Sequence, residues 1–403
     1  MHILLIHQAF ATLDEPGGTR HHELARGLAG HGHQVTVIAS PISYLTGAVT
    51  GQGQAASSHE EGITIVHTYA TRAIHRSFVH RMIGFFSFML TSFWAGLHVR
   101  NVDLIWGTSP PIFQGLTALI LARLKGVPFL FEVRDLWPAF AVQVGVLRNP
   151  LLIRLSEWLE RFLYRNADQL MVNSPGFIAH VQARGACQVA LIPNGADPRM
   201  FDPLADGRAF RQTHRLGNQF IALYAGAHGM SNDLGVVLEA AQRLRDTPGI
   251  CFVLLGDGKE KPALEQQAKE LELPNLRFVP SIPKADMPDA LAAADACIAI
   301  LKPIPLYATV YPNKVFDYMA AGRPVLMAID GVARQVVEQA KAGIFCQPGD
   351  PAKLADAVRD LAADPAYARQ MGANGRGYIE DHFDRVKLAD QLVNLIEKMA
   401  KRL

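Results

Sequence analysis

Short apolar runs alternate with helical patterns along nearly the whole chain, and this alternation strongly limits the possible folds. The runs span residues 2–6, 34–40, 63–68, 103–107, 128–133 and 169–174 in the first half, and 220–226, 249–258, 276–280, 296–300 and 323–328 in the second. Amphipathic stretches such as 19–33 and 234–246 separate them. This spacing is typical of parallel sheets with crossover helices, which makes the chain an α/β protein. Because 403 residues are many for one core, we expect two such sheets.

The stretch 193–218 is rich in Pro, Gly, Asp and Arg and separates the two groups of runs, so it is predicted to connect two domains. The net charge of +2 is too small to indicate a nucleic-acid partner. The four cysteines form no CxxC pair, and the N-terminal MHILLIHQAF lacks the basic region of a signal peptide. We therefore expect thiols in a reducing compartment and a cytoplasmic location.

The loops that follow the strands are the expected ligand site, since ligands of open parallel sheets bind beyond the carboxyl ends of the strands. With two sheets, the natural site is a cleft between them. Gly17 and Gly18 precede a helix capped near Thr19, where free backbone N–H groups suit an anion. A plain turn explains this loop equally well. No GxGxxG motif follows the first strand, so a dinucleotide site is not expected.

Two further strand ends carry polar groups. Arg134 and Asp135 follow the run 128–133, where opposite charges indicate either a cleft or a mutual ion pair that closes the strand. Gly226 ends another run, and His228 beyond it could contact a phosphate or cap the turn. The dispersed histidines show no ligand spacing for a metal, and the pair His21-His22 is interpreted as solvated or capping.

The segment YPNKVFDYMAAGRP predicts a short helix that begins near Pro312 or Asn313 and ends at a capping Gly322. Lys314 and the first amides of this helix suit a diphosphate, because a helix N-terminus attracts anions. Asp317, one turn further on, suits ribose hydroxyls because a carboxylate accepts two hydrogen bonds. The same spacing also fits an ordinary Lys–Asp helix pair.

The stretch PNKVFDYMAAGRPVL resembles the signature of the family 4 retaining glycosyltransferases, which have the GT-B fold. Further segments match in order: PGGTRHHELARGLAGHGHQVTV, VNSPGFIAHV, LIPNGADPRMF, LLGDGKEKPALE and FVPSIPKADMPDALAAADACIAIL. EVRDLWPAF resembles the WbuB-like branch, which acts in bacterial O-antigen and capsule assembly. The resemblance implies two Rossmann-like parallel-sheet domains that face a cleft. Residues 1–193 would serve the acceptor and 194–385 the donor, with a final helix at 386–403 packed back on the first domain.

The resemblance also implies the activity. A hexosyl or N-acetylhexosaminyl group would move with retention from a nucleotide diphosphate, most simply UDP, to a lipid-linked or saccharide acceptor. No metal or other cofactor would be needed, and the leaving phosphate would help to deprotonate the acceptor. One alternative is a UDP-sugar 2-epimerase of the same fold, for which no acidic residues around a sugar could be assigned. Another is a non-catalytic scaffold that binds nucleotide sugars.

The chain departs from the family pattern at its charged positions. The family usually carries two glutamates that flank seven residues; Asp317 stands at the second, which contacts ribose, and Thr309 at the first, which contacts the donor sugar. Ala227 and Asn232 stand where the family has a phosphate-binding Arg and Lys. A diphosphate leaving group gathers negative charge in the transition state, so Lys314 is expected to supply the missing positive charge.

The complete expected site has two parts. The expected catalytic residues are Lys314, Arg134, Asp135 and His228. The expected donor-binding residues are Asp317, Asn313, Pro312, Thr309, Gly17, Gly18 and Gly226, with Val279 and Ile282 near the base.

Two strongly apolar segments suggest where an acceptor binds. Residues 75–100 are rich in aromatic residues, and Arg72, Arg76, Arg81 and Arg100 flank their uncharged part, 82–97, which is shorter than the roughly 20 residues of a span. Residues 151–166 mix Leu, Trp and Phe with arginines. Both fit interfacial helices on the inner face of the plasma membrane, which would suit a polyprenyl-diphosphate-linked acceptor. The alternative is a buried helix and a domain-facing helix.

Overall fold

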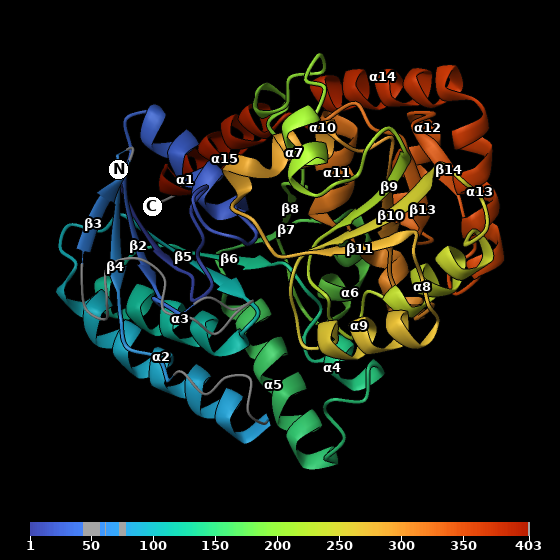
Figure 1. Cartoon of the computed structure of the whole chain (residues 1–403). Helices are drawn as coiled ribbons and strands as arrows, with labels where there is room; N and C mark the ends of the chain where they lie inside the picture. Colours follow the sequence, from blue (N-terminus) through green and yellow to red (C-terminus); the bar gives the residue numbers. More distant parts are fainter. Residues whose placement is uncertain (43–56, 61, 72–77, 402–403) are drawn as a thin grey trace. The chain divides into compact units, whose positions relative to one another are not determined.

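The computed structural model describes residues 1–42, 57–60, 62–71 and 78–401 (Figure 1). The chain divides into two compact units, one of Met1–Pro193 with Val386–Leu403 and one of Asn194–Arg385. Each unit holds one sheet. Among the described residues, no helix combines the length and the apolar composition that crossing a membrane requires.

The first unit is built on an eight-stranded sheet in the order β3-β4-β2-β1-β5-β6-β7-β8. The bounds are β1 His2–Ile6, β2 Gln34–Ala39, β3 Ser57–Glu60, β4 Ile63–His67, β5 Leu104–Ser109, β6 Phe129–Val133, β7 Gln169–Val172 and β8 Val189–Leu191. All pairs are parallel except that β3 runs antiparallel to β4. Each of the six runs predicted in the first half overlaps a strand, while the short edge strands β3 and β8 were not predicted.

Helices cover both faces of this sheet (Figure 1). The helices α1 (Arg20–Gly30) and α15 (Arg385–Ala400) lie on one face, and α2 (Phe78–His98), α3 (Ile112–Lys125) and α5 (Pro150–Asn166) lie on the other. The shorter α4 (Ala139–Gln143), η1 (Pro175–Phe177) and α6 (Ile178–Ala183) complete the unit. Because both faces are covered, the central strands are rich in apolar residues and buried at every position, with Glu132 of β6 as a buried charged exception.

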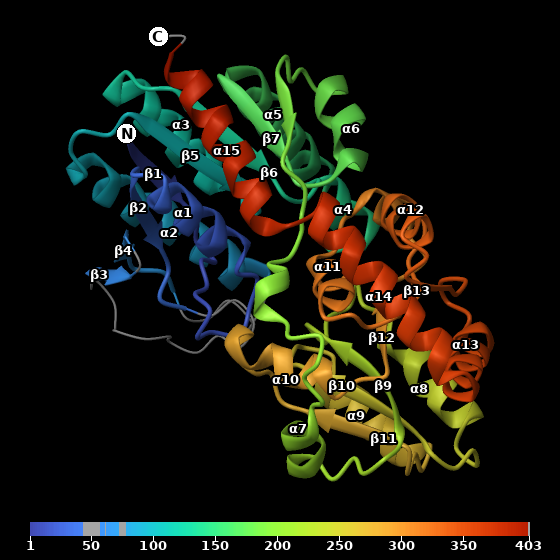
Figure 2. The ribbon, with the colours of Figure 1, turned by 90° about the horizontal axis from the view of Figure 1, so that it is seen from above.

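The last helix packs on the first, as Figure 2 also shows. A Cβ added to Gly27 in α1 would lie 2.4 Å from the Cβ of Ala389 in α15, so the two helices touch at a glycine. Leu388 and Leu392 of α15 are buried in the same core as Ile3 and Leu5 of β1. The predicted return of the C-terminal helix to the first sheet is therefore confirmed.

The second unit has a six-stranded, wholly parallel sheet in the order β11-β10-β9-β12-β13-β14. The strands are β9 Phe220–Ala225, β10 Ile250–Leu255, β11 Leu276–Val279, β12 Ala296–Ile300, β13 Val325–Ala328 and β14 Gly343–Phe345. The helices α8 (Leu234–Arg243), α9 (Lys261–Glu270) and α13 (Pro351–Ala363) share one core with the sheet. The other core is shared by α7 (Arg208–Thr213), α10 (Met287–Ala292), α11 (Asn313–Ala320), α12 (Val332–Gln339) and α14 (Pro365–His382).

The stretch 193–218, predicted as a connection between domains, is almost entirely part of the second unit. It contains the 3-10 helix η2 (Pro198–Met200) and the helix α7. Phe201, Phe210 and Leu216 are buried in the core of this unit. The prediction was wrong because the Pro- and Gly-rich composition hides three well-spaced apolar anchors.

Candidate functional site

The carboxyl end of the second sheet carries two loops that pack backbone on backbone. The loop after β9 begins at Gly226, and the loop after β10 begins at Gly256. A Cβ on Gly256 would lie 1.9 Å from the carbonyl oxygen of Gly226, and one on Gly258 would lie 2.5 Å from that of His228. The amide of His228 also donates to the carbonyl of Asp257 at 2.8 Å. Both glycines have positive φ values, +141° and +156°, so side chains are excluded by space and by conformation.

Lys314, in the first turn of α11, points at the loop after β9. Its ammonium donates to the hydroxyl of Tyr224 at 2.8 Å and lies 3.9 Å from the centroid of that ring. It also donates to Asn232 Oδ1 at 3.4 Å. Gly226 has a φ of +149°, which side chains rarely adopt, and a Cβ there would also lie 2.9 Å from the Lys314 Nζ atom. The lysine therefore reaches the loop in which the family's basic pair is missing, and its hydrogen bonds are made there rather than to Asp317.

Two residues that sequence reasoning missed hold this lysine in place. The hydroxyl of Tyr224 donates to the carbonyl of Ala227 at 2.7 Å, and the Asn232 amide donates to the same oxygen at 2.9 Å. Both groups thus turn their acceptor atoms toward Lys314. The surrounding protein keeps water away from the ammonium and lowers the pKa of Lys314 to about 7. Because its pKa is lowered, Lys314 can be neutral in the free protein and take up a proton when an anion binds beside it.

Asp317, one turn further along α11, forms an ion pair with Lys284. The Lys284 Nζ atom lies 2.6 Å from Asp317 Oδ2, and it also lies 5.5 Å from the centroid of the Phe201 ring. Lys284 is in the 3-10 helix η3 (Lys284–Asp286), directly after the segment FVPSIP. This pairing was not predicted, because the two residues belong to different elements that are far apart in the sequence. The pair fixes the orientation of the carboxylate proposed to accept ribose hydroxyls.

His228 is enclosed by the two glycine loops and is 0% exposed. Its ring lies 6.0 Å from that of Tyr224 and 6.2 Å from that of Phe278, measured between centroids. Burial is the largest effect on its pKa, which falls to about 4, so the imidazole is neutral at pH 7. Neither ring nitrogen has a hydrogen-bond partner among the described residues. A neutral ring in this position supports the loops, and its contact with a phosphate stays a prediction.

The other predicted donor-binding residues of this unit lie at the same edge of the sheet. Pro312 is the N-cap of α11 and Asn313 is its first residue. Thr309 ends the 3-10 helix η4 (Pro305–Thr309), and its hydroxyl donates to a carbonyl within that helix at 2.7 Å. Val279 ends β11 and is buried, and Ile282 packs against the core beside it. Their roles in binding a sugar or a base stay predictions.

In the first unit, Arg134 and Asp135 follow β6 and line a cavity of about 240 Å³. Arg134 donates to His7 Nε2 at 2.9 Å, and the other ring nitrogen of His7 lies 2.8 Å from the hydroxyl oxygen of Thr108. Loss of water raises the pKa of Asp135 to about 7, although Arg134 acts in the opposite direction. The remaining lining residues are Gln8, Ala9, Ser40, Ile42, Ala70, Thr71, Phe85, Pro110 and Pro111. Among the lining residues that the structure describes, Arg134 and Asp135 are the two of charged type.

The interpretation of His21-His22 as solvated or capping was wrong. Both are buried, because α1 lies flat on the sheet. His21 Nε2 lies 2.7 Å from Glu132 Oε2, and Arg20 donates to the other oxygen at 3.0 Å. Burial acts to raise the pKa of Glu132, but these two neighbours hold it well below its usual value. This buried ion-paired cluster ties α1 to β6.

The predicted glycine loop precedes α1. Gly17 has a φ of +156°, and a Cβ there would lie 3.1 Å from the Cβ of Ala11. At Gly18 a Cβ would meet nothing within 4 Å, so the backbone beside it is open. Thr19 is the N-cap of α1, and its hydroxyl bonds to Glu23 at 2.5 Å. The loop has room for a ligand, and its contact with one stays a prediction.

Comparisons with known proteins identify the family. Residues 17–195 match the model of the glycosyl transferase 4-like domain, and residues 219–364 match that of the glycosyl transferases group 1. The chain belongs to the group 1 (family 4) glycosyltransferases. It is 25% identical over 388 residues to WcaI of Escherichia coli K12, named as a colanic acid biosynthesis glycosyl transferase, with 92% of this chain and 94% of that protein covered. It is equally 25% identical over 415 residues to a glycogen synthase of Mycobacterium tuberculosis, covering 100% of this chain and 96% of that one.

Solved structures of glycosyltransferases share the fold of this family member. The sucrose-phosphate synthase of Thermosynechococcus elongatus superposes with a TM-score of 0.81 at 21% identity and covers 100% of both chains. HepE of Anabaena, solved in complex with UDP-glucose, superposes with a TM-score of 0.73 at 17% identity, covering 99% of this chain and 100% of that one. The predicted GT-B fold is therefore confirmed, and the chain is a glycosyltransferase.

Proposed function

We propose that this glycosyltransferase moves a hexosyl or N-acetylhexosaminyl group, with retention, from a UDP-sugar to a polyprenyl-diphosphate-linked or saccharide acceptor of a bacterial surface polysaccharide. The observation that carries the proposal is Lys314, whose ammonium is held at the glycine loop after β9 by Tyr224 and Asn232. HepE, a structural neighbour, is described with UDP-glucose bound, and the relative WcaI is named for colanic acid. The segment EVRDLWPAF supports the WbuB-like branch.

In the proposed reaction, the bond between the anomeric carbon and the β-phosphate oxygen breaks. A new bond forms on the same face of the sugar between that carbon and the acceptor oxygen. The acceptor proton passes to the leaving phosphate, so charge and atoms balance without a metal or other cofactor. Lys314 neutralises the charge that develops on the diphosphate. Asp317, oriented by Lys284, accepts hydrogen bonds from the ribose hydroxyls.

The acceptor side of the proposal is supported by exposed apolar side chains on the three helices of one face of the first sheet. We call this set the apolar helical surface; it comprises Ile83, Phe86, Leu90 and Trp94 in α2, Ile120 and Leu124 in α3, and Leu151, Leu152, Leu155 and Trp158 in α5. In α2 the residues recur at helical spacing, which makes one stripe. Exposed Arg148, Arg154, Arg161 and Arg165 flank the α5 part. Apolar and basic residues together fit an anionic membrane surface.

This surface favours a membrane-linked acceptor over a soluble glucan, which would need no exposed tryptophans. Trp94 and Trp158 are 62% and 61% exposed. We accordingly place the enzyme on the inner face of the plasma membrane as a peripheral protein. Of the segment 75–100 that suggested this role, the structure describes residues 78–100; Arg76 and the preceding Arg72 lie outside the described residues.

The donor is tested by thermal unfolding of wild type and Asp317→Ala with UDP, GDP, ADP and NAD. A ligand at about 100 times its Kd adds roughly 2.7 kcal/mol, which raises Tm by about 2–4 °C. We expect a shift with UDP alone that Asp317→Ala loses. Asp246→Ala, which removes an acid that is 95% exposed, is the matched control. A shift with another nucleotide would replace the proposed donor, and no shift with any would favour the non-catalytic scaffold.

Turnover is tested by release of UDP in the presence of acceptor. Lys314→Ala should abolish release while thermal unfolding stays cooperative. Wild-type rates in that variant would overturn the role of Lys314. Formation of a new UDP-sugar without acceptor would instead identify an epimerase.

A further inference from the structure

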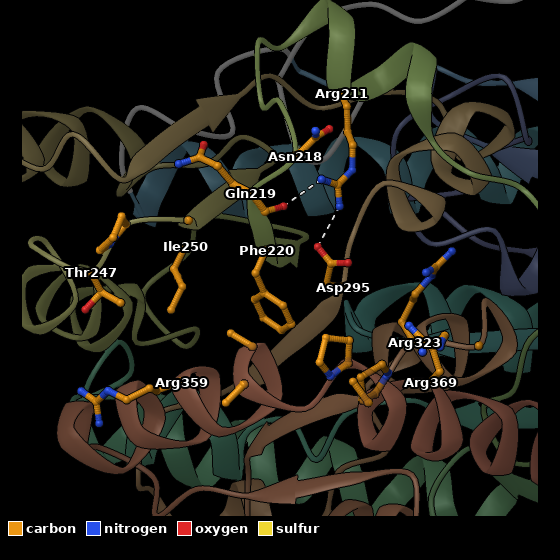
Figure 3. A pocket seen from close by; sticks show the side chains of 18 residues that line it. Arg211, Asn218, Gln219, Phe220, Thr247, Ile250, Asp295, Arg323, Arg359 and Arg369 are labelled. Carbon is orange, nitrogen blue, oxygen red and sulfur yellow. Dashed lines mark hydrogen bonds and ion pairs between the residues drawn. The ribbon is translucent and has the colours of Figure 1, made fainter.

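A second cavity, of about 600 Å³, lies at the amino end of the second sheet (Figure 3). Phe220 and Ile250, which begin β9 and β10, line it together with the turn Gly322–Pro324 that precedes β13. Lys314 and the glycine loops lie at the opposite end of these strands. Since β9 has six residues, the two ends are about 17–20 Å apart at the usual rise of a strand. The cavity is therefore separate from the candidate donor site.

The cavity is strongly basic. Four arginines line it, Arg211, Arg323, Arg359 and Arg369, against one carboxylate, Asp295. Two of the arginines form ion pairs with aspartates of the same unit, which accounts for their presence. Arg211 pairs with Asp295 at 2.7 Å, as Figure 3 shows, and Arg359 pairs with Asp356 at 2.8 Å.

The other two arginines have no carboxylate within 4.0 Å in the part of the chain that the structure describes. Arg323 donates only weakly, across 3.5 Å, to the carbonyl of Ala205, and its Nε atom is buried without a hydrogen-bond partner among the described residues. Arg369 is exposed in the first two turns of α14. Figure 3 shows both side chains at the same side of the cavity. A buried guanidinium N–H without an acceptor is costly, and an anion would satisfy it.

The backbone fixes the position of Arg323. Helix α11 ends in a Schellman motif, in which Arg323 N donates to the carbonyl of Tyr318 and Gly322 N to that of Met319, each at 3.0 Å. Gly322 takes the left-handed conformation that this cap requires, with a φ of +66°. The Gly-Arg-Pro sequence thus turns the chain at the end of α11 and sends the arginine to the amino end of the sheet. The proposed transfer reaction uses no part of this turn.

We infer that this cavity binds a small phosphorylated metabolite through Arg323 and Arg369. Guanidinium groups match phosphate oxygens in a bidentate geometry, and a volume of this size holds a ligand as large as a sugar phosphate or a nucleotide. Phe220, Ile250 and Pro324 offer apolar contacts to the part that is not phosphate. The site goes beyond the proposed function, which needs only the opposite end of the sheet.

Isothermal titration of the full chain with inorganic pyrophosphate and with glucose 6-phosphate tests the inference. We expect Arg369→Gln to weaken the binding of at least one probe by about tenfold. The loss of a charge-assisted hydrogen bond changes a dissociation constant by roughly this factor. Arg323→Lys, which keeps the charge but loses the fork, should also weaken it. Arg243→Gln, an exposed arginine of α8 outside the cavity, is the matched control.

Lys314→Gln separates this site from the donor site. Binding that survives in Lys314→Gln but is weakened in Arg369→Gln supports the cavity, whatever the outcome for UDP. No binding of either probe to wild type would overturn the inference. So would equal losses in Arg369→Gln and Arg243→Gln, or a loss confined to Lys314→Gln.

Discussion

Lys284 and Asp317 form an ion pair across 2.6 Å, and the lysine residue is only 8% exposed. The pair joins η3 to α11 and so connects two of the segments that surround the candidate donor site. A carboxylate held in this way cannot rotate freely, which suits the proposed role of Asp317 in accepting hydrogen bonds from two ribose hydroxyls at once. It also makes each partner dependent on the other.

Lys284→Met should therefore destabilise the protein by about 2 kcal/mol, because it removes the cation that pairs with a largely enclosed carboxylate. Adding Asp317→Asn to this variant should recover part of the loss, since the side chain at 317 then carries no charge. Urea unfolding of both single variants and the double variant measures the coupling as a cycle. Strictly additive effects would show that the pair contributes nothing.

UDP affinity should fall as the pH rises from about 7 to about 9. The pKa of Lys314 is about 7 in the free protein, so the ammonium is present below that pH and is lost above it. An anion binds the charged form better, and the Kd can rise by up to about tenfold per pH unit in this range. Titration calorimetry at several pH values measures the slope.

Lys314→Arg is the control for this pH dependence, because an arginine stays charged throughout the range. Its Kd for UDP should be nearly constant from about pH 7 to about pH 9. A flat wild-type profile would contradict both the lowered pKa and the contact with the diphosphate.

Gly256→Ala should disrupt the carboxyl end of the second sheet. The new Cβ would lie 1.9 Å from the Gly226 carbonyl oxygen, so one of the two loops must move. We expect a loss of stability of about 2 kcal/mol or more and a weaker response to UDP. Gly235→Ala is the matched control, since a Cβ there meets nothing within 4 Å in helix α8. It should stabilise the helix by up to about 1 kcal/mol, and thermal unfolding compares the two.

Trp158→Glu should release the protein from anionic vesicles. The indole is 61% exposed and stacks on Phe162 with 5.4 Å between the ring centroids, so a charge there opposes insertion without entering the core. Flotation at low salt measures the bound fraction. Tyr367→Glu, which adds the same charge at a 53% exposed aromatic residue of the second unit, should float like wild type. If the wild-type protein stays at the bottom of the gradient, the proposed membrane contact is wrong.

The sequence was most informative where apolar residues form runs. Every predicted run overlaps a strand, because strands buried on both faces are rich in consecutive apolar residues. The strands that were missed, β3, β8 and β14, are edge strands of three or four residues, such as the polar SSHE of β3. These short strands form by pairing with a neighbouring strand, so their own sequences show no apolar pattern that would predict them.

The residues of the candidate site could be proposed from the sequence, but the contacts that they make could not. Lys314 and Asp317 stand out in a helix that begins at a strand end, whereas their partners Tyr224 and Lys284 look like a core residue and a surface residue. Only the fold brings them together, and Tyr224 is 90 positions away from Lys314 in the chain. The interpretation of His21 was wrong for the same reason, because the sequence alone does not show which side of α1 faces Glu132.

The packing of α15 on α1 sets an order of events during synthesis. The first unit begins with β1 at the start of the chain, yet its core contains Leu388, Leu392 and Ile396 of α15. The second unit, Asn194–Arg385, is complete before that helix leaves the ribosome. The apolar face of the first unit that α15 covers can therefore be closed only after the whole second unit has been translated.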